Sequence, residues 1–254
     1  MSITLTKVRL PMRRKDVLRR MRLIDTLHQN IHRKLTLISA PAGYGKSALL
    51  LDFAVDIDDI VDASVCWYSV SPEDIALLPF VEHIIVSFQQ HFPDFGVQLL
   101  ESLQKPGSNP DAQSLAGELI NEMVLQIDDF CVFMLDDYHL AGETEPIILF
   151  IKSLLRDLPD QVRFIITGRA DFGIPTASLY ARDDLKVINA GDLRFRADEI
   201  QQLVRQNCRV KLEDELANEL ATRADGWIVG ILMAVHTLQH GTLPSFSGRA
   251  RPVV

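Results

Sequence analysis

The segment LTLISAPAGYGKSALL, residues 35–50, constrains the fold of this chain more than any other part of it. LTLIS has the composition of a buried strand, and the residues from 46 onward have the spacing of a helix. Between them lies the glycine-containing loop APAGYGKS, residues 40–47. A strand that fixes a tight loop of backbone N–H groups, followed by a helix N-terminus facing the same point, forms an anion cradle. The segment therefore predicts a phosphate-binding loop.

The residue types within this loop suit a nucleotide. Gly43 and Gly45 permit the backbone angles and close approach that a phosphate needs, and Lys46 is placed to reach the β and γ phosphates of ATP. The Ser47 hydroxyl is placed to bind Mg²⁺. The usual pattern opens with glycine where this chain has Ala40, but no phosphate-contacting group is lost. The residues expected to bind ATP or ADP are Ala42, Gly43, Tyr44, Gly45, Lys46, Ser47 and Ala48.

The rest of the chain alternates between two kinds of segment. Short apolar or β-branched runs occupy 35–39, 65–70, 131–135, 162–167 and 186–189. Segments with helical spacing occupy about 16–29, 46–56, 75–91, 112–126, 145–157 and 197–207. This alternation is typical of parallel strands joined by helical crossovers. It predicts an α/β fold of the P-loop NTPase class, a parallel sheet flanked by helices and followed by a small helical subdomain.

The pattern also divides the chain. From about residue 197 the strands stop, and 197–207, 213–224 and 226–238 are predicted to form three helices. We expect an N-terminal segment and helix at 1–33, a P-loop NTPase α/β domain at 34–192, the helical subdomain at 193–240, and a tail or linker at 241–254. The chain between residues 93 and 111 is interrupted by Pro93, Pro106, Gly107 and Pro110, which predicts a surface insertion there.

Two carboxylates follow the apolar run 131–135 in the sequence CVFMLDDYHL. A magnesium–nucleotide site needs a carboxylate at the C-terminal end of a buried strand, and we expect this strand to lie next to the strand that carries the loop. Asp136 is expected to bind Mg²⁺, and Asp137 to orient or deprotonate a water. The alternative is that both residues only cap the loop after the strand.

Arg169 stands just beyond the next apolar run, in VRFIITGRAD. A positive side chain at that strand end is able to sense the γ-phosphate, because its partner disappears on hydrolysis; the alternative is an ordinary surface arginine.

Structural roles are expected for Tyr138 and His139. Trp227 is expected in the core, with packing on the nucleotide base as the alternative.

Charge and composition limit the partners. The chain has 254 residues and a net charge of −8, yet residues 1–34 hold ten Lys and Arg against two Asp and Glu. The acidic remainder is a poor surface for duplex DNA. The basic stretch is interpreted as a solvated helix with one or two arginines turned toward the nucleotide, and a nucleic-acid arm is the alternative.

Localisation and redox chemistry follow from smaller features. The N-terminus carries charges where a signal peptide needs an apolar core, and no apolar run approaches the roughly 18 residues of a spanning helix. We therefore expect a cytoplasmic protein with no membrane partner. Cys66, Cys131 and Cys208 are too scattered for a disulfide framework or a zinc site and are interpreted as buried apolar residues.

Several motifs together resemble the N-terminal ATPase module of MalT-like transcription activators, the large LuxR-type branch of the STAND signal-transduction NTPases. The motifs are VLRRMRLIDTL, LTLISAPAGYGKSALL, VCWYSVSPED, MLDDYHL, FIITGRAD, DLRFRADEI and ADGWIVGILMA. The resemblance covers nearly the whole chain. It departs from the family in length, because the family's winged-helix region, helical-repeat sensor and C-terminal helix-turn-helix do not fit after residue 240.

The resemblance implies a nucleotide switch in transcription regulation. ADP would hold the module closed and monomeric, ATP with an inducer would permit self-association, and slow hydrolysis would reset it. By the same resemblance, Gly43 to Ser47 bind phosphates, Asp136 organises Mg²⁺, Asp137 assists water, Arg169 is the sensor and Arg20 lines the nucleotide. DNA binding is expected only through a C-terminal domain absent from this chain.

Other functions stay open at this point. A small-molecule kinase should carry an arginine-rich lid over the phosphates. Residues 170–185 contain a single arginine, Arg182, so no such lid is indicated. An AAA+-like ring ATPase shares a strand-end sensor and is harder to separate by sequence. A module that holds ATP or ADP without significant turnover is the third alternative.

Overall fold

A five-stranded parallel sheet forms the centre of the protein. The computed structural model describes residues 3–61, 63–105, 107, 110–169, 172–174, 176–240 and 251–252. The strands are β1 (Leu35–Ser39), β2 (Ser64–Ser69), β3 (Cys131–Asp136), β4 (Val162–Gly168) and β5 (Leu185–Ile188), in the order β2-β3-β4-β1-β5. Every neighbouring pair is parallel. Each predicted strand therefore exists, with bounds shifted by no more than one residue.

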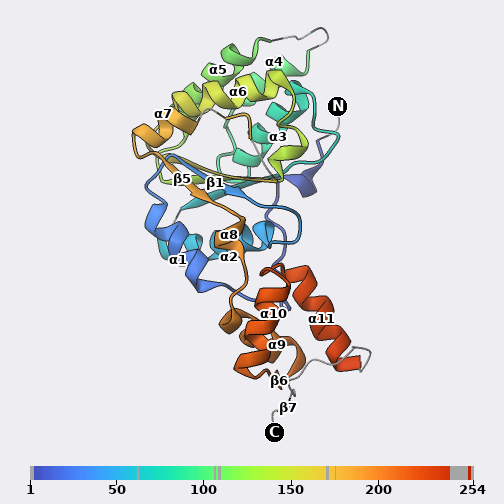
Figure 1. Ribbon diagram of the computed structural model, residues 1–254. Helices are drawn as coiled ribbons and strands as arrows, with labels where there is room; N and C mark the ends of the chain where they lie inside the picture. Colours follow the sequence, from blue (N-terminus) through green and yellow to red (C-terminus); the bar gives the residue numbers. More distant parts are fainter. Residues whose placement is uncertain are drawn as a thin grey trace.

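Helices cover both faces of this sheet (Figure 1). On one face lie α1 (Met21–Asn30), α2 (Lys46–Val61) and α8 (Ala190–Leu193). On the other lie α3 (Leu77–Phe88), α4 (Val97–Leu103), α5 (Ala112–Gln126), α6 (Glu145–Arg156) and α7 (Thr176–Ala181). Short 3-10 turns occur at Leu5–Lys7 and Tyr138–Leu140. Among the described residues, no helix combines the length and hydropathy needed to cross a membrane.

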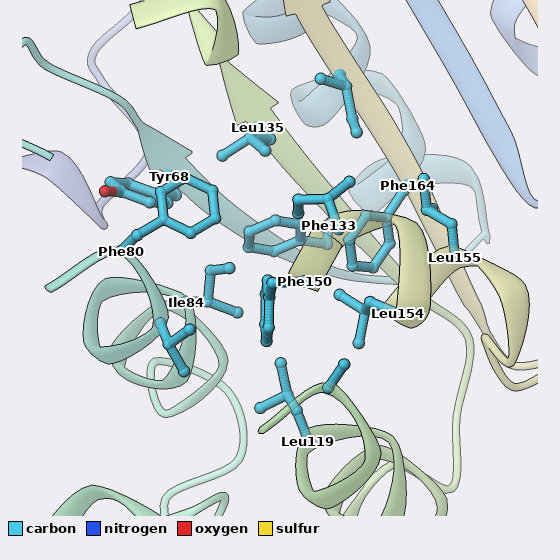
Figure 2. Packing of buried hydrophobic residues seen from close by; sticks show 14 of the residues in the cluster. Tyr68, Phe80, Ile84, Leu119, Phe133, Leu135, Phe150, Leu154, Leu155 and Phe164 are labelled. Atoms are coloured by element: carbon cyan, nitrogen blue, oxygen red, sulfur yellow. The ribbon is translucent and has the colours of Figure 1, made fainter. Parts of the chain in front are cut away.

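Alternate residues of the strands supply two separate cores. Phe133 and Leu135 of β3 face α3, α5 and α6, and Figure 2 shows them packed with Tyr68, Phe80 and Phe150. The residues between them, such as Met134, join the second core with α1 and α2. Because the strands are buried on both faces, they carry continuous apolar runs, as parallel strands do.

A smaller unit follows the sheet and has its own core. It contains α9 (Ala197–Cys208), α10 (Asp214–Arg223) and α11 (Ile228–His240), with the short strands β6 (Val210–Lys211) and β7 (Arg251–Pro252). Its apolar cluster includes Leu203, Leu216 and Ile231, and Leu18 from the N-terminal segment also packs there. Residues 241–250 and 253–254 of the expected tail or linker lie outside the described residues.

Three expectations about the fold were wrong. The first α-helix begins at Met21 rather than near residue 16, and residues 16–20 are not helical. Residues 93–111 include α4, and they bury Phe95, Leu99 and Leu103 in the main core rather than forming only a surface insertion. The strand that carries Asp136 is not next to β1, because β4 lies between them.

Candidate nucleotide-binding site

The loop between β1 and α2 has the geometry of an anion cradle. Gly43 and Gly45 have φ angles of +81° and +79°, a region that other residue types rarely adopt. Lys46 is only 6% exposed, and its ammonium group donates hydrogen bonds to the carbonyl oxygens of Ala40 at 2.8 Å and Pro41 at 3.1 Å. Burial lowers the pKa of Lys46, while Asp137 and Asp136 act in the opposite direction. The loop therefore holds its cation beside two carboxylates.

Thr167 at the end of β4 joins those two acidic residues. Its hydroxyl donates to Asp136 Oδ1 at 2.6 Å and accepts the backbone N–H of Asp137 at 3.0 Å. Asp136 is 4% exposed. Burial raises its pKa, and hydrogen bonds from Thr167 and Ser47 partly offset that rise. Ser47 and Asp136 are thus brought together although one strand separates β1 from β3.

The residues of the site still meet although β4 lies between β1 and β3. Because all the strands are parallel, their C-terminal ends meet at the same edge of the sheet as the loop. Asp137 follows β3, Arg169 follows β4, and both line one cavity of about 280 Å³. The other lining residues belong to the loop and the start of α2: Ala42, Gly43, Gly45, Lys46, Ser47 and Ala48. We refer to this as the phosphate cavity.

Three sequence-predicted positions need separate comment. The Tyr44 side chain does not line the phosphate cavity but packs against the core under α1 and α2, whereas its backbone remains in the loop. His139 lies beside the site, with Nδ1 3.7 Å from Asp137 Oδ1, and neither ring nitrogen has a hydrogen-bond partner in the described structure. Burial lowers the pKa of His139. Tyr138 is fully buried and stacks on Phe172, as a structural role requires.

A second cavity, of about 270 Å³, adjoins the loop on the side of the helical subdomain. Gly43, Gly45 and Ala48 line both cavities, so the two meet at the loop. The remaining walls come from distant parts of the chain, including Val17 before α1 and Ile228 in α11. We refer to it as the subdomain cavity. Its walls are largely apolar with a few polar groups, as is common for small-molecule sites.

Arg20 ties the two cavities together. Its guanidinium donates to the carbonyl oxygens of Leu193 at 2.7 Å and Tyr44 at 3.3 Å, and lies 4.4 Å from the centre of the Phe195 ring. Arg20 is 5% exposed, and burial lowers its pKa to about 10. One buried cation therefore contacts the phosphate loop and the segment that leads into the subdomain, and it lines the subdomain cavity.

Residues 13–17 close the subdomain cavity from outside. Arg13 pairs with the buried Asp52 of α2. From α9, Gln206 and Asn207 donate to the carbonyl oxygens of Lys15 and Asp16, each at 2.8 Å. This segment is consequently held between α2 and the helical subdomain.

Trp227 makes a further contact between the subdomain and the loop. Its indole N–H donates to the Ala42 carbonyl oxygen at 3.0 Å. At 38% exposed it is not a core residue, so that expectation was wrong. The contact involves residues 185 positions apart, and no local pattern in the sequence indicates it.

Comparisons with known proteins agree with this arrangement. No family model matches the chain. The chain is 28% identical over 235 residues to the HTH-type transcriptional regulator MalT of Vibrio parahaemolyticus, and 28% identical over 238 residues to the serine/threonine-protein kinase PknK of Mycobacterium tuberculosis. These matches cover 92% and 93% of this chain but 25% and 21% of the relatives. The chain thus spans about a quarter of the length of the curated relatives it matches.

Solved structures establish the fold class independently. A signal-transduction ATPase with numerous domains (STAND) from Pyrococcus horikoshii, which carries a tetratricopeptide-repeat sensor, gives a TM-score of 0.57 at 15% identity, over 89% of this chain and 31% of that one. A Walker-type ATPase of Pyrococcus abyssi gives 0.54 at 15% identity, over 94% and 72%. The predicted P-loop NTPase fold is confirmed, and so is the resemblance to the MalT-like NTPase domain.

Proposed function

We propose that this chain, a homologue of the N-terminal NTPase domain of MalT-like regulators, is a switch module that binds ATP or ADP and hydrolyses ATP slowly. The meeting of the two cavities at Gly43, Gly45 and Ala48 supports this most directly. A nucleotide with its phosphates in the phosphate cavity would extend its nucleoside into the subdomain cavity. It would then contact the α/β domain and the helical subdomain at once.

The residues at the loop fit a magnesium–nucleotide complex. Asp136 is a buried carboxylate whose desolvation is only partly offset by its neighbours, so a nearby divalent cation would stabilise it. Among the described residues, no group of three or more metal-ligating His, Cys, Asp and Glu side chains occurs. Mg²⁺ at nucleotides commonly uses one or two protein ligands together with phosphate oxygens and water. Ser47 and Asp136 are the protein ligands we propose.

Two further residues would act on the terminal phosphate. Asp137 lines the phosphate cavity and is partly exposed, so it is placed to orient a water against the γ-phosphate. Arg169 lines the same cavity from the next strand end, where its guanidinium would pair with the γ-phosphate of ATP and lose that partner with ADP. Arg169 thus contributes differential binding energy, which a switch requires.

The switch would act on the subdomain. The subdomain contacts the loop through Trp227, and Arg20 bonds to the segment that leads into the subdomain. A nucleotide that shifts the loop would therefore also shift the helices α9 to α11. The relative named a transcriptional regulator suggests that the readout is transcription. We propose nucleotide-dependent self-association as the step that links the nucleotide to this readout.

The Arg169→Ala substitution tests the switch against a module that only holds its nucleotide. A charge-assisted contact is worth roughly 1.5–3 kcal/mol, so we expect affinity for a non-hydrolysable ATP analogue to fall about ten- to hundredfold. ADP affinity should stay nearly unchanged, and the exposed Arg205→Ala on α9 should change neither. Calorimetry on the three proteins decides the matter. Parallel losses for both nucleotides, or no loss for either, would remove Arg169 from the mechanism.

A further inference from the structure

A third cavity, of about 290 Å³, lies at the end of the molecule away from the helical subdomain. Its lining residues come from α6, from α7 and the residues beside it, and from α5 through Gln113. Figure 1 shows α5, α6 and α7 on the side of the sheet away from the helical subdomain. It shares no lining residue with the phosphate cavity or the subdomain cavity. We refer to it as the α6–α7 cavity.

The inner part of this cavity is apolar apart from one hydroxyl. Its lining includes Leu149, Leu155, Ile174 and Leu179. Ser153 also lines it and is only 5% exposed. The cavity therefore offers a hydrogen-bonding group at an apolar wall.

The rim is cationic. Lys152 and Arg156 lie one helical turn apart on α6, and Arg182 directly follows the last residue of α7. Arg156 pairs with Asp157 at 2.8 Å, whereas neither Lys152 nor Arg182 has a carboxylate partner within the described ranges. No described acidic side chain lines the cavity. In a chain of net charge −8, two unpaired cations at one opening are not a consequence of composition.

We propose that the α6–α7 cavity binds a small amphiphilic anion, a carboxylate or phosphate ester on a compact apolar body. The apolar wall accepts the body, the cations of Lys152 and Arg182 accept the charge, and the Ser153 hydroxyl supplies a hydrogen bond. The volume is at the small end of the range for ligand sites, which favours a compact molecule over a nucleotide. This site is independent of the proposed nucleotide switch.

Phenyl phosphate and benzoate are suitable probes, with uncharged benzamide as the control for apolar binding alone. Each is titrated into the wild-type chain by calorimetry. The double variant Lys152→Gln/Arg182→Gln removes the two unpaired cations, which are exposed and support no described contact in the core. The matched variant Lys105→Gln/Arg205→Gln removes two exposed cations elsewhere. Ser178→Trp, at the exposed rim, fills the cavity without changing its charge.

We expect saturable binding of one or both anions, and the preferred probe distinguishes a carboxylate from a phosphate ligand. Affinity should fall about tenfold or more in Lys152→Gln/Arg182→Gln and in Ser178→Trp, and stay at the wild-type value in the matched variant. Benzamide should bind more weakly than either anion that binds. No saturable binding of either anion, equal losses in the two double variants, or undiminished binding in Ser178→Trp overturns the proposal.

Phenyl phosphate could also enter the phosphate loop, so the titration is repeated with Lys46→Ala. Unchanged affinity there places the probe outside the loop, whereas loss of binding overturns the proposal. Nucleotide affinity should be the same in Lys152→Gln/Arg182→Gln and wild type. A failure of the nucleotide switch would appear in the Arg169→Ala experiment and leaves this result unaffected.

Discussion

The substitution Gly43→Ala tests whether the helical subdomain rests on the phosphate loop. A Cβ atom at Gly43 would lie 2.4 Å from Trp227 Nε1 and 2.8 Å from Val229 Cγ2, both from the subdomain. Carbon atoms do not approach other heavy atoms so closely, so Trp227 must move. Its hydrogen bond to the Ala42 carbonyl would then be lost.

Gly107 provides the matched control for the magnitude. Its φ of +82° nearly equals the +81° of Gly43, but a Cβ there meets nothing within 4 Å. Both substitutions carry the left-handed backbone cost of about 1–2 kcal/mol. Gly43→Ala carries in addition the lost hydrogen bond, about 0.5–1.5 kcal/mol, and part of the Trp227 contact area. We expect Gly43→Ala to be less stable than Gly107→Ala by about 1–2 kcal/mol.

Urea unfolding followed by tryptophan fluorescence measures this difference. The chain has two tryptophans, and Trp67 is buried in the sheet, so a change in the native emission spectrum of Gly43→Ala reports Trp227. In a Trp227→Ala background the share of the extra cost that comes from Trp227 should vanish, and only the contact of the new Cβ with Val229 Cγ2 should remain. Equal stability of Gly43→Ala and Gly107→Ala would refute the contact between loop and subdomain.

Three further outcomes follow from the site. Lys46→Ala should abolish ATP binding by calorimetry and leave the circular dichroism spectrum unchanged, because it removes a cation that belongs to none of the three apolar cores. Burial raises the pKa of Asp136, so the native state holds that proton more tightly than the unfolded chain and stability falls as pH rises from about 4 through the native pKa. Asp136→Asn should therefore melt higher than wild type at pH 7, with the gain shrinking near pH 3, and should weaken the magnesium dependence of ATP binding. Arg20→Lys cannot hold both the Leu193 and Tyr44 carbonyls, so unfolding should cost about 1–3 kcal/mol less, measured in urea. A melting temperature of Asp136→Asn below wild type at pH 7, or an Arg20→Lys variant as stable as wild type, would contradict these assignments.

The parts of the site that the sequence predicts are those encoded locally. The loop lies within one continuous segment, 35–50, whose strand, glycines and helix start are all visible in the sequence. Asp136 and Arg169 could be placed at strand ends because a buried parallel strand is a recognisable apolar run. Their meeting at the loop then follows from the common edge of a parallel sheet. Their chemical roles remain predictions.

The parts that the sequence does not predict depend on long-range contacts. An apolar run in the sequence indicates a strand but not which strands lie beside it in the sheet. The sequence therefore did not predict that β4 lies between β1 and β3. Helix α4 is short and lies among prolines, and tertiary burial of Leu99 and Leu103 outweighs the weak local signal. No local sequence pattern indicates the subdomain cavity, because the residues that line it are far apart in the sequence and meet only in the folded chain.

The contacts of residues 13–17 have a consequence for the synthesis of this protein. Their partners Gln206 and Asn207 lie 191 residues later in the chain. At roughly 5–20 residues per second on the ribosome, these two partners are synthesised on the order of 10–40 s after residues 13–17. The strand β1, which leads into the phosphate loop, pairs with β4 and β5, and the later of these ends at Ile188. The strands beside the phosphate loop are therefore synthesised before the helix α9 that holds residues 13–17 at the subdomain cavity.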